Sequence, residues 1–329
     1  MSNSEIVLDV EGLHVDITTP GGVLHAVRDV SFQVRRGETL CVVGESGCGK
    51  SMTSLAIMGL LPKMARRRAR TLTFLNEDLG KAGKKRVNNL RGNKMAMIFQ
   101  EPMTALNPAY TIGDQLTEHY VHHRQSTMVQ ARERAVELLE KVGIASAAGR
   151  LGQYPHQLSG GLRQRVMIAM ALMCGPELLI ADEPTTALDV TIQAQILRLL
   201  ADLQKELGIA MVLITHDLGV VARIAQNVAV MYAGEIVEGG PAREIFARPR
   251  HPYTQGLMSC IPVPGRTPPG GKLGTIRGVV PTLIGELAGC AFRERCPYAQ
   301  PICGETVPVY HSPLGQSWRC IRKDDGVPL

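Results

Sequence analysis

Three short apolar runs along the chain show no alternation with polar residues. They cover residues 40–43, 178–181 and 210–214. Strands buried on both faces of a parallel sheet read as continuous apolar runs of this length, whereas half-exposed strands alternate apolar and polar positions. We therefore expect an α/β fold with a parallel core sheet.

Helical patterns fill much of the chain between these runs. Residues 53–58 are helix-like, residues 104–170 look helical, and a further helical segment runs from Ser159 to Met173. The clearest amphipathic helix covers residues 130–142, where these apolar side chains fall near one face: Ala131, Ala135, Leu138, Leu139 and Val142. Residues 6–47 read as strands and turns, and the Pro- and Gly-rich residues 261–285 predict loops that lead into a small tail.

Eight residues join the first apolar run to the helix that follows it. They are Gly44, Glu45, Ser46, Gly47, Cys48, Gly49, Lys50 and Ser51. Glycines at this spacing allow a tight wrap whose N–H groups face phosphate oxygens, Lys50 supplies charge to the β- and γ-phosphates, and the Ser51 hydroxyl can ligate Mg²⁺. The context of strand, loop and helix predicts that the chain binds a nucleoside triphosphate. Cys48 lies beside Lys50 and a helix N-terminus, which predicts thiolate character at its sulfur.

A second candidate anion site precedes the helical segment that ends at Met173. Ser159, Gly160 and Gly161 stand where a helix begins, and free N–H groups at a helix N-terminus suit a γ-phosphate. Because one phosphate site already exists, this one makes sense if it serves the nucleotide of another subunit. Taken alone, the same residues form an ordinary cap and turn.

Acidic and imidazole side chains follow the second and third apolar runs. Asp182 and Glu183 end the run at 178–181, and ligands gather at the carboxyl ends of parallel strands. Asp182 is placed to hold Mg²⁺ through water and Glu183 to polarise an attacking water, although two acids after a strand can also begin a turn. His216 follows the run at 210–214 and is placed to contact the γ-phosphate.

These motifs together resemble the ATP-binding cassette (ABC) ATPases that drive transporters. The resemblance rests on the loop at 44–51, Gln100, the signature at 158–162, the acid pair, Asp189 and His216, which occur in that family's order. It implies a P-loop NTPase of the ABC type, with a RecA-like core, an antiparallel β subdomain and a helical subdomain at about residues 104–170 that docks onto membrane subunits.

The same resemblance implies roles for individual residues. Two cassettes pair head to tail, so that each ATP lies between one subunit's phosphate loop and the other's signature. Gln100 would ligate Mg²⁺ and sense the membrane subunit, Glu183 would be the catalytic base, and Asp189 would communicate across the dimer. The family usually stacks adenine on an aromatic residue, but none precedes Phe32, so Ile17 or His25 is the candidate here.

Length and composition agree with one large domain plus an appendage. The chain has 329 residues, 45% of them hydrophobic, which supports a sizeable core. No apolar run reaches the roughly 18 residues of a spanning helix. Residues 1–5 lack a basic region followed by an apolar core, so we expect no signal peptide and a cytosolic protein whose membrane contact is through partners. The resemblance to transporter ATPases implies a peripheral location at the cytoplasmic face of the inner membrane.

The formal net charge is +6, and much of the basicity lies in residues 65–70 and 81–86. Such runs are usually solvated faces. A second interpretation is that these basic runs are attracted to anionic lipid headgroups. Direct nucleic-acid binding ranks last, because the basic runs are not interleaved with aromatic residues, which make up only 4% of the chain.

Four of the eight cysteines lie in the last 40 residues, at Cys290, Cys296, Cys303 and Cys320. In a chain expected to face the cytosol, disulfides are disfavoured and clustered thiols suggest Zn²⁺ or an iron–sulfur cluster. The spacings lack the C-x₂-C knuckles of structural zinc sites. Unligated, buried cysteines are the remaining alternative.

The tail also resembles a particular subfamily. Residues 251–254 and 290–299 look like the C-terminal extension of ATPase subunits of dipeptide and oligopeptide importers, a subfamily that also includes nickel importers. Some members bind a 4Fe-4S cluster through four such cysteines, which favours that cluster over zinc. The resemblance divides the chain into an ABC ATPase domain at 1–250 and the extension at 251–329.

The function that these observations predict is ATP hydrolysis that powers the uptake of di- or oligopeptides. The subfamily pairs two different ATPases on two membrane permeases, and a periplasmic or extracellular binding protein delivers the substrate. Nickel or another small solute is the alternative cargo. The alternative of another class is a soluble ABC ATPase of DNA repair, translation or iron–sulfur assembly. Repair members carry a coiled coil, and translation members join two cassettes in one chain. An assembly ATPase would leave the importer-like tail unexplained.

Overall fold

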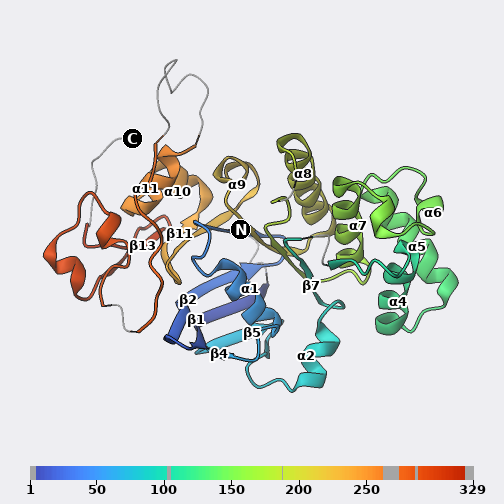
Figure 1. Cartoon of the computed structure of the whole chain (residues 1–329), viewed down its shortest axis with the longest axis horizontal. Coiled ribbons are helices and arrows are strands. Elements are labelled where there is room, and N and C mark those ends of the chain that lie inside the picture. The colour runs from blue at the N-terminus through green and yellow to red at the C-terminus, as the bar shows by residue number, and fades with distance from the viewer. Residues whose placement is uncertain (1–4, 102–104, 187, 262–273, 286–287, 323–329) are drawn as a thin grey trace, which may run out of the picture. The chain divides into compact units, whose positions relative to one another are not determined.

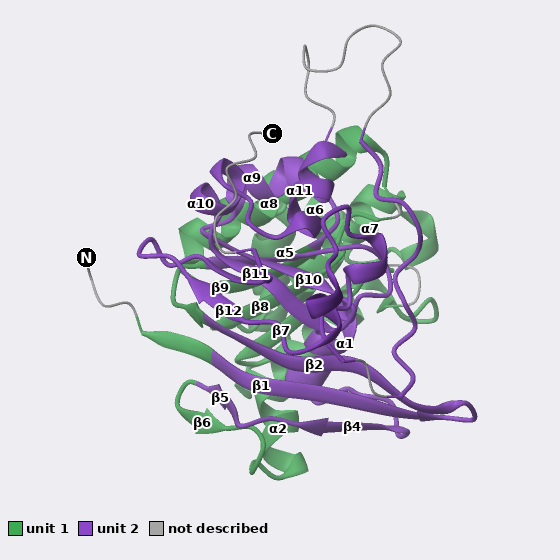
Figure 2. Ribbon diagram, turned by 90° about the vertical axis from the view of Figure 1, so that its left-hand side faces the viewer, with its two compact units in different colours: residues 1–8, 34–38, 75–214 green, residues 9–33, 39–74, 215–329 purple. Residues whose placement is uncertain are grey.

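Figure 1 shows the computed structural model of the chain, and Figure 2 colours its two compact units separately. Unit 1 comprises residues 1–8, 34–38 and 75–214, and unit 2 comprises residues 9–33, 39–74 and 215–329. The structure describes residues 5–101, 105–186, 188–261, 274–285 and 288–322.

Unit 1 contains a parallel sheet whose strands pair in the order β9-β8-β7. These are β7 (Met95–Ile98), β8 (Leu178–Asp182) and β9 (Ala210–Thr215), and every residue of β8 and β9 is buried. Both strands predicted from continuous apolar runs in this part of the chain are therefore confirmed. The remaining elements are β6 (Glu77–Asp78), α2 (Lys84–Leu90), α4 (Ile112–Arg124), α5 (Met128–Lys141), α6 (Ala147–Arg150), the 3₁₀ helix η1 (Pro155–Gln157), α7 (Gly160–Leu172) and α8 (Val190–Leu207).

Helix α5 begins and ends close to the limits that its sequence predicts. Thr127 caps it by accepting from the backbone N–H of Gln130, whose side chain accepts in turn from the Thr127 N–H. The buried face carries Ala131, Ala135, Leu138 and Leu139, as the periodicity requires, and packs against α4 and α7.

Unit 2 contains two sheets. The first has the strand order β12-β13-β11-β10-β3, in which only β10 and β3 run parallel. Its strands are β3 (Thr39–Val43), β10 (Asn227–Tyr232), β11 (Glu235–Pro241), β12 (Val309–His311) and β13 (Ser317–Arg319). The second pairs β2 with β1 and β1 with β5, while β4 runs antiparallel to β1. These strands are β1 (Ile6–Thr19), β2 (Gly22–Arg35), β4 (Ala65–Arg68) and β5 (Thr71–Phe74).

The helices of unit 2 are short and mostly follow strands. They are α1 (Lys50–Met58), α9 (Leu218–Ile224), α10 (Ala242–Ala247), α11 (Pro252–Ser259), and the 3₁₀ helices η2 (Arg293–Arg295) and η3 (Pro301–Gly304).

The tail joins the first sheet of unit 2, because β13 extends that sheet by pairing with β11. Glu238 of β11 is buried there, and its carboxylate accepts from the backbone N–H groups of Arg250 and His251, both at 2.8 Å, and from the Gln316 side chain at 2.6 Å. Burial raises the pKa of this carboxyl group, whereas each of these donors lowers it. A buried carboxylate with this many donors holds the segments that supply them in place.

The predicted loop region at 261–285 lies partly outside the described residues. Its described part, residues 274–285, contains no helix, and Ile284 forms an isolated bridge with Leu24 of β2. Among the described residues, no helix is both long enough and apolar enough to cross a membrane.

A histidine in α4 should make the stability of the chain depend on pH. Burial, followed by the neighbouring His123 and His122, lowers the pKa of His119 from 6.5 to about 4. The folded state resists protonation of His119, so the free energy of unfolding is highest above pH 6.5. It decreases by about 1–3 kcal/mol as the pH falls from 6.5 towards 4. We expect His119→Gln to reduce the fall in urea-unfolding midpoint between pH 7 and pH 5. The exposed His156→Gln variant serves as control, and an unchanged fall in His119→Gln would refute the assignment.

Candidate functional site

The phosphate-binding loop predicted from the sequence lies in unit 2, between the fully buried strand β3 and the start of α1 at Lys50. Gly44 and Gly49 have φ values of 155° and 103°, which residues other than glycine rarely adopt. A Cβ atom on Gly44 would lie 2.2 Å from the carbonyl oxygen of Met231, and one on Gly49 would lie 2.4 Å from that of Ala26. The wrap therefore requires glycine at both positions.

Lys50 lies inside this loop and is 4% exposed. Its ammonium donates to the carbonyl oxygens of Gly44 at 2.9 Å and of Glu45 at 3.0 Å. The cation is thus held against the backbone of the loop, where a phosphate group can compete for its N–H donors.

The sequence prediction for Cys48 is wrong. The side chain is 1% exposed, and burial raises the pKa of its thiol even though Lys50 acts in the opposite direction. Desolvation of the thiolate therefore outweighs the nearby ammonium, and Cys48 is a thiol at neutral pH.

The two candidates for contact with adenine also lie in unit 2. The Nδ1 atom of His25 lies 2.6 Å from a carboxylate oxygen of Asp16. Burial opposes ionisation of Asp16, but hydrogen bonds from His25 and Arg68 outweigh it and lower the pKa of the carboxyl group. Ile17 lies opposite Ala65 in the pairing of β1 with β4. The contact of Ile17 or His25 with the adenine base stays a prediction.

In unit 1 the structure brings together Gln100 and Glu183, which the sequence predicted to share a site. Glu183 follows β8, and one of its carboxylate oxygens accepts from Nε2 of Gln100 at 3.3 Å and from the Thr186 hydroxyl at 2.9 Å. Its backbone N–H donates to the carbonyl oxygen of Ile214 on the neighbouring strand. Glu183 has a φ of 44°, in the left-handed region that non-glycine residues seldom adopt. Asp182, the last residue of β8, is 5% exposed.

The signature residues and Asp189 cap two helices of unit 1. The Ser159 hydroxyl accepts from the N–H of Leu162 at the start of α7, and an Asp189 carboxylate oxygen accepts from the N–H of Ile192 at the start of α8. A Cβ atom on Gly161 would lie 3.2 Å from the Ile192 side chain. The glycine thus allows the first turn of α7 to approach the first turn of α8.

His216 lies in unit 2, directly after β9, and the next residue, Asp217, is the N-cap of α9. The Asp217 side chain caps this helix by accepting from the N–H groups of Gly219 and Val220. The local structure therefore fixes the backbone beside His216.

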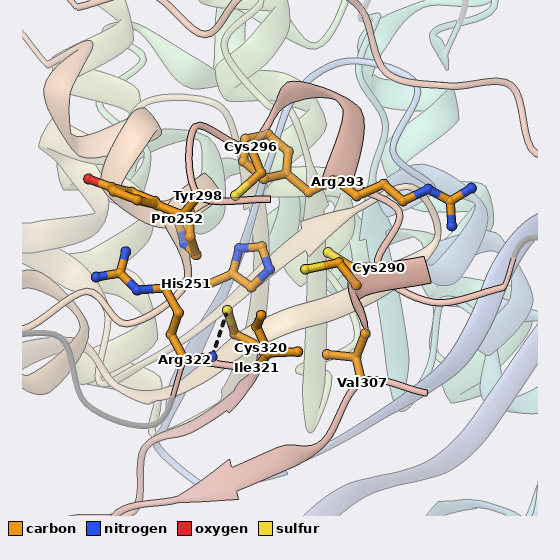
Figure 3. A pocket seen from close by; sticks show the side chains of 12 residues that line it. His251, Pro252, Cys290, Arg293, Cys296, Tyr298, Val307, Cys320, Ile321 and Arg322 are labelled. Atoms are coloured by element: carbon orange, nitrogen blue, oxygen red, sulfur yellow. Dashed lines mark hydrogen bonds between the residues drawn. The ribbon is translucent and has the colours of Figure 1, made fainter. Parts of the chain in front are cut away.

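The four tail cysteines line a single pocket in unit 2, together with His251 and Phe292. Figure 3 shows Cys290, Cys296, Cys320 and His251 around this pocket. None of the four forms a disulfide, and the backbone N–H of Cys290 donates to the carbonyl oxygen of Cys303 at 2.8 Å. Burial, with smaller contributions from the other three thiols, raises the pKa of Cys290 to about 11. Within the part of the chain that the structure describes, no three His, Cys, Asp or Glu side chains are arranged to hold a metal ion.

One set of contacts at the phosphate loop could not be expected from the sequence. The Arg295 guanidinium donates to both carboxylate oxygens of Glu45, at 2.7 and 2.9 Å, and the Tyr253 hydroxyl accepts from the Glu45 N–H at 2.9 Å. Tyr253 belongs to a segment, residues 251–254, that the sequence links to peptide importers without assigning it a role. Nothing in the local pattern around Arg295 indicates a partner 250 positions earlier in the chain.

Comparison with known proteins agrees with this geometry. Residues 27–186 match the family described as ABC transporter, and residues 237–303 match the oligopeptide/dipeptide transporter C-terminal region. The chain is similar to the dipeptide transport ATP-binding protein DppD of Bacillus subtilis, with 50% identity over 92% of this chain and 90% of that protein. It is similar to DppD of Escherichia coli, with 49% identity over 92% of each chain. A putative peptide import ATP-binding protein of Brucella melitensis is 51% identical over 96% of this chain and 97% of its own length.

Solved structures support the same fold. The dimeric ATP-binding cassette MJ0796 bound to ADP and Pi superimposes with a TM-score of 0.63 at 25% identity, covering 72% of this chain and 99% of that one. The cbiO1 protein of Clostridium perfringens, part of an ABC transporter complex, gives a TM-score of 0.63 at 28% identity, covering 74% of this chain and 92% of its own. The predicted fold class, an α/β cassette ATPase, is confirmed. The chain belongs to the ABC transporter family, as an ATP-binding protein with a C-terminal region of the oligopeptide/dipeptide transporter type.

Proposed function

We propose that this chain is the ATP-hydrolysing subunit of an ABC importer that powers the uptake of di- or oligopeptides across the cytoplasmic membrane. The observation that carries the proposal is the 50% identity to a dipeptide transport ATP-binding protein over at least nine-tenths of both chains. That similarity includes the C-terminal region as well as the cassette, so it is not a similarity of the ATPase motifs alone. We also propose residues 1–250 as the ATPase domain, with a helical subdomain at 104–170, and residues 251–329 as the extension.

We propose that the loop residues 44–51 bind the phosphates of ATP through backbone N–H groups and the Lys50 ammonium. Bound Mg²⁺ neutralises charge on the β- and γ-phosphates, and its proposed ligands are Ser51, Gln100 and, through water, Asp182. Both glycines of the tight wrap and the position of Lys50 against the loop backbone support this assignment.

We propose Glu183 as the base that accepts a proton from the attacking water, and His216 as a contact to the γ-phosphate. The hydrogen bond from Gln100 to Glu183 supports the pairing of a Mg²⁺ ligand with the base, and the left-handed backbone at Glu183 supports a functional role.

A head-to-tail pair of cassettes would complete each ATP site. Ser159, Gly160 and Gly161 would contact the nucleotide of the partner cassette, and Asp189 would communicate across the dimer. The partners proposed for this chain are two membrane permeases, a second homologous ATPase and an external substrate-binding protein. They would hold the chain peripherally at the cytoplasmic face of the inner membrane.

The four-thiol pocket is proposed to hold a 4Fe-4S cluster. Four cysteines that line one pocket and form no disulfide fit all-thiolate ligation, in which the cluster takes four separate thiolates. A single Zn²⁺ is the less favoured metal, because the cysteine spacings lack the C-x₂-C knuckles of structural zinc sites. Such a cluster would deprotonate the coordinating thiols, including Cys290, whose pKa burial raises.

The importer proposal is tested by purifying the chain from detergent-solubilised native membranes and identifying its companions by mass spectrometry. We expect two polytopic membrane proteins and a second cassette ATPase to accompany it. Recovery of only soluble, ribosomal or DNA-associated partners would reject the importer in favour of a soluble ABC ATPase.

Glu183→Gln should abolish turnover and retain ATP. Removing the proposed base is expected to lower phosphate release by roughly 100-fold or more, since the amide cannot accept the proton of water. ATP binding should persist, because the phosphate loop is unchanged. The matched control is Glu206→Gln, whose carboxylate pairs with Lys141 on the surface. Appreciable residual hydrolysis in Glu183→Gln would contradict the assignment of the base.

Anaerobically purified protein should contain about four iron and four sulfide ions per chain, as expected for a cluster with four thiolate ligands. Cys303→Ser should lose the brown absorbance and most of the iron, whereas the remote Cys260→Ser should keep both. Colourless, iron-free wild-type protein with normal activity would rule the cluster out, and stoichiometric zinc would establish the other metal.

A further inference from the structure

Glu45, the second residue of the phosphate-binding loop, is held from three directions. Its carboxylate accepts two hydrogen bonds from Arg295, its backbone N–H donates to the Tyr253 hydroxyl, and its carbonyl oxygen accepts from Lys50. Two of these three anchors come from the C-terminal part of the chain. The conformation of the loop at this position therefore depends on residues far outside the loop itself.

Arg295 is built into the protein rather than lying on its surface. Its side chain is 5% exposed, and its guanidinium carbon lies 5.6 Å from the ring centre of Tyr232 and 5.8 Å from that of Phe292. The same guanidinium also donates to the backbone carbonyl of Arg277 at 2.8 Å. A fork-shaped cation with this many fixed contacts presents its donors to Glu45 in one geometry.

The charge of Glu45 explains why this contact matters to a nucleotide. A carboxylate in a loop that receives a triphosphate repels the ligand unless a cation compensates it. Lys50 donates to the backbone oxygen of Glu45, whereas Arg295 pairs with the carboxylate itself. In a protein with this pairing, the phosphates meet a neutral ion pair instead of a free anion.

We propose that Arg295 and Tyr253 are positioning residues for the phosphate-binding loop, through which the C-terminal region sets the affinity of the cassette for ATP. The proposal rests on the proposed function, namely that residues 44–51 bind ATP. Arg295 neutralises and orients the Glu45 side chain, and Tyr253 fixes its backbone.

Residues that surround Arg295 and Tyr253 also line the four-thiol pocket. Phe292 lines that pocket and packs against Tyr232 and Tyr253, with ring centres 5.2 and 5.3 Å apart. Arg295 directly precedes Cys296, one of the four cysteines. The segment that shapes the pocket is therefore the segment that carries the contact to Glu45.

The test is the affinity of the purified full-length chain for MgATP, measured by titration calorimetry, with the KM for ATP from phosphate release as a second readout. We expect Arg295→Met to weaken ATP binding roughly tenfold and to raise KM with kcat changed less than about twofold, because the free Glu45 carboxylate opposes binding without touching the base. Arg295→Lys should lose less affinity for ATP, since lysine keeps the positive charge but cannot make the two parallel hydrogen bonds of a guanidinium. Tyr253→Phe should lower the affinity for ATP about threefold.

Two further variants separate positioning from loss of folding. Arg86→Met removes a guanidinium that pairs with the surface carboxylate of Glu77 through hydrogen bonds, and should bind ATP like the wild type. Glu45→Gln in the Arg295→Met background should recover most of the lost affinity, because it removes the uncompensated charge. Equal affinity in Arg295→Met and the wild type, or no recovery in the double variant, would overturn the inference. Wild-type protein that fails to bind ATP would instead reject the proposed function.

Discussion

The tight backbone wrap between β3 and α1 is the constraint on which the rest of unit 2 depends. Backbone oxygens of Met231 and Ala26 approach so closely that only glycine fits at Gly44 and Gly49. The turn after β10 is tied to the same loop, since the N–H of Gly234 donates to the carbonyl oxygen of Cys48 at 2.9 Å. Strands β2, β3 and β10 must therefore hold their positions within small tolerances for the loop to form, because a buried backbone cannot leave its polar groups unpaired.

Local patterns in the sequence predicted the elements of this cassette well. The continuous apolar runs became β3, β8 and β9, and the 3.6-residue periodicity located α5 to within two residues of its observed start. Glycine spacing indicated the phosphate loop, because the need for positive φ is itself a local property of the chain. Gln100 and Glu183 were assigned to one site by the resemblance to ABC ATPases and not by a local pattern, and a hydrogen bond joins their side chains, while their roles stay predictions.

Properties that depend on burial or on distant partners could not be predicted in this way. The proximity of Cys48 to Lys50 is visible in the sequence, but the complete burial that raises the thiol pKa is not. The pairing of Arg295 with Glu45 could not be predicted either, because nothing in the sequence around Arg295 indicates which distant residue accepts its hydrogen bonds. The sequence showed that four cysteines cluster, and the structure adds that they line one pocket with Phe292.

The C-terminal region is part of the folded core of unit 2 and not a loosely attached tail. Strand β13 continues the sheet through β11, and the buried Glu238 draws donors from residues 250, 251 and 316 onto one carboxylate. Removing any of these donors would leave buried charge less well solvated, which typically costs about 1–3 kcal/mol. His251, which donates to Glu238, also caps α11 by accepting from the N–H of Tyr253, and Tyr253 in turn accepts from the phosphate loop. Hydrogen bonds thus connect β11 to the loop through two neighbouring residues, so the geometry of the loop and the folding of the C-terminal region depend on the same contacts.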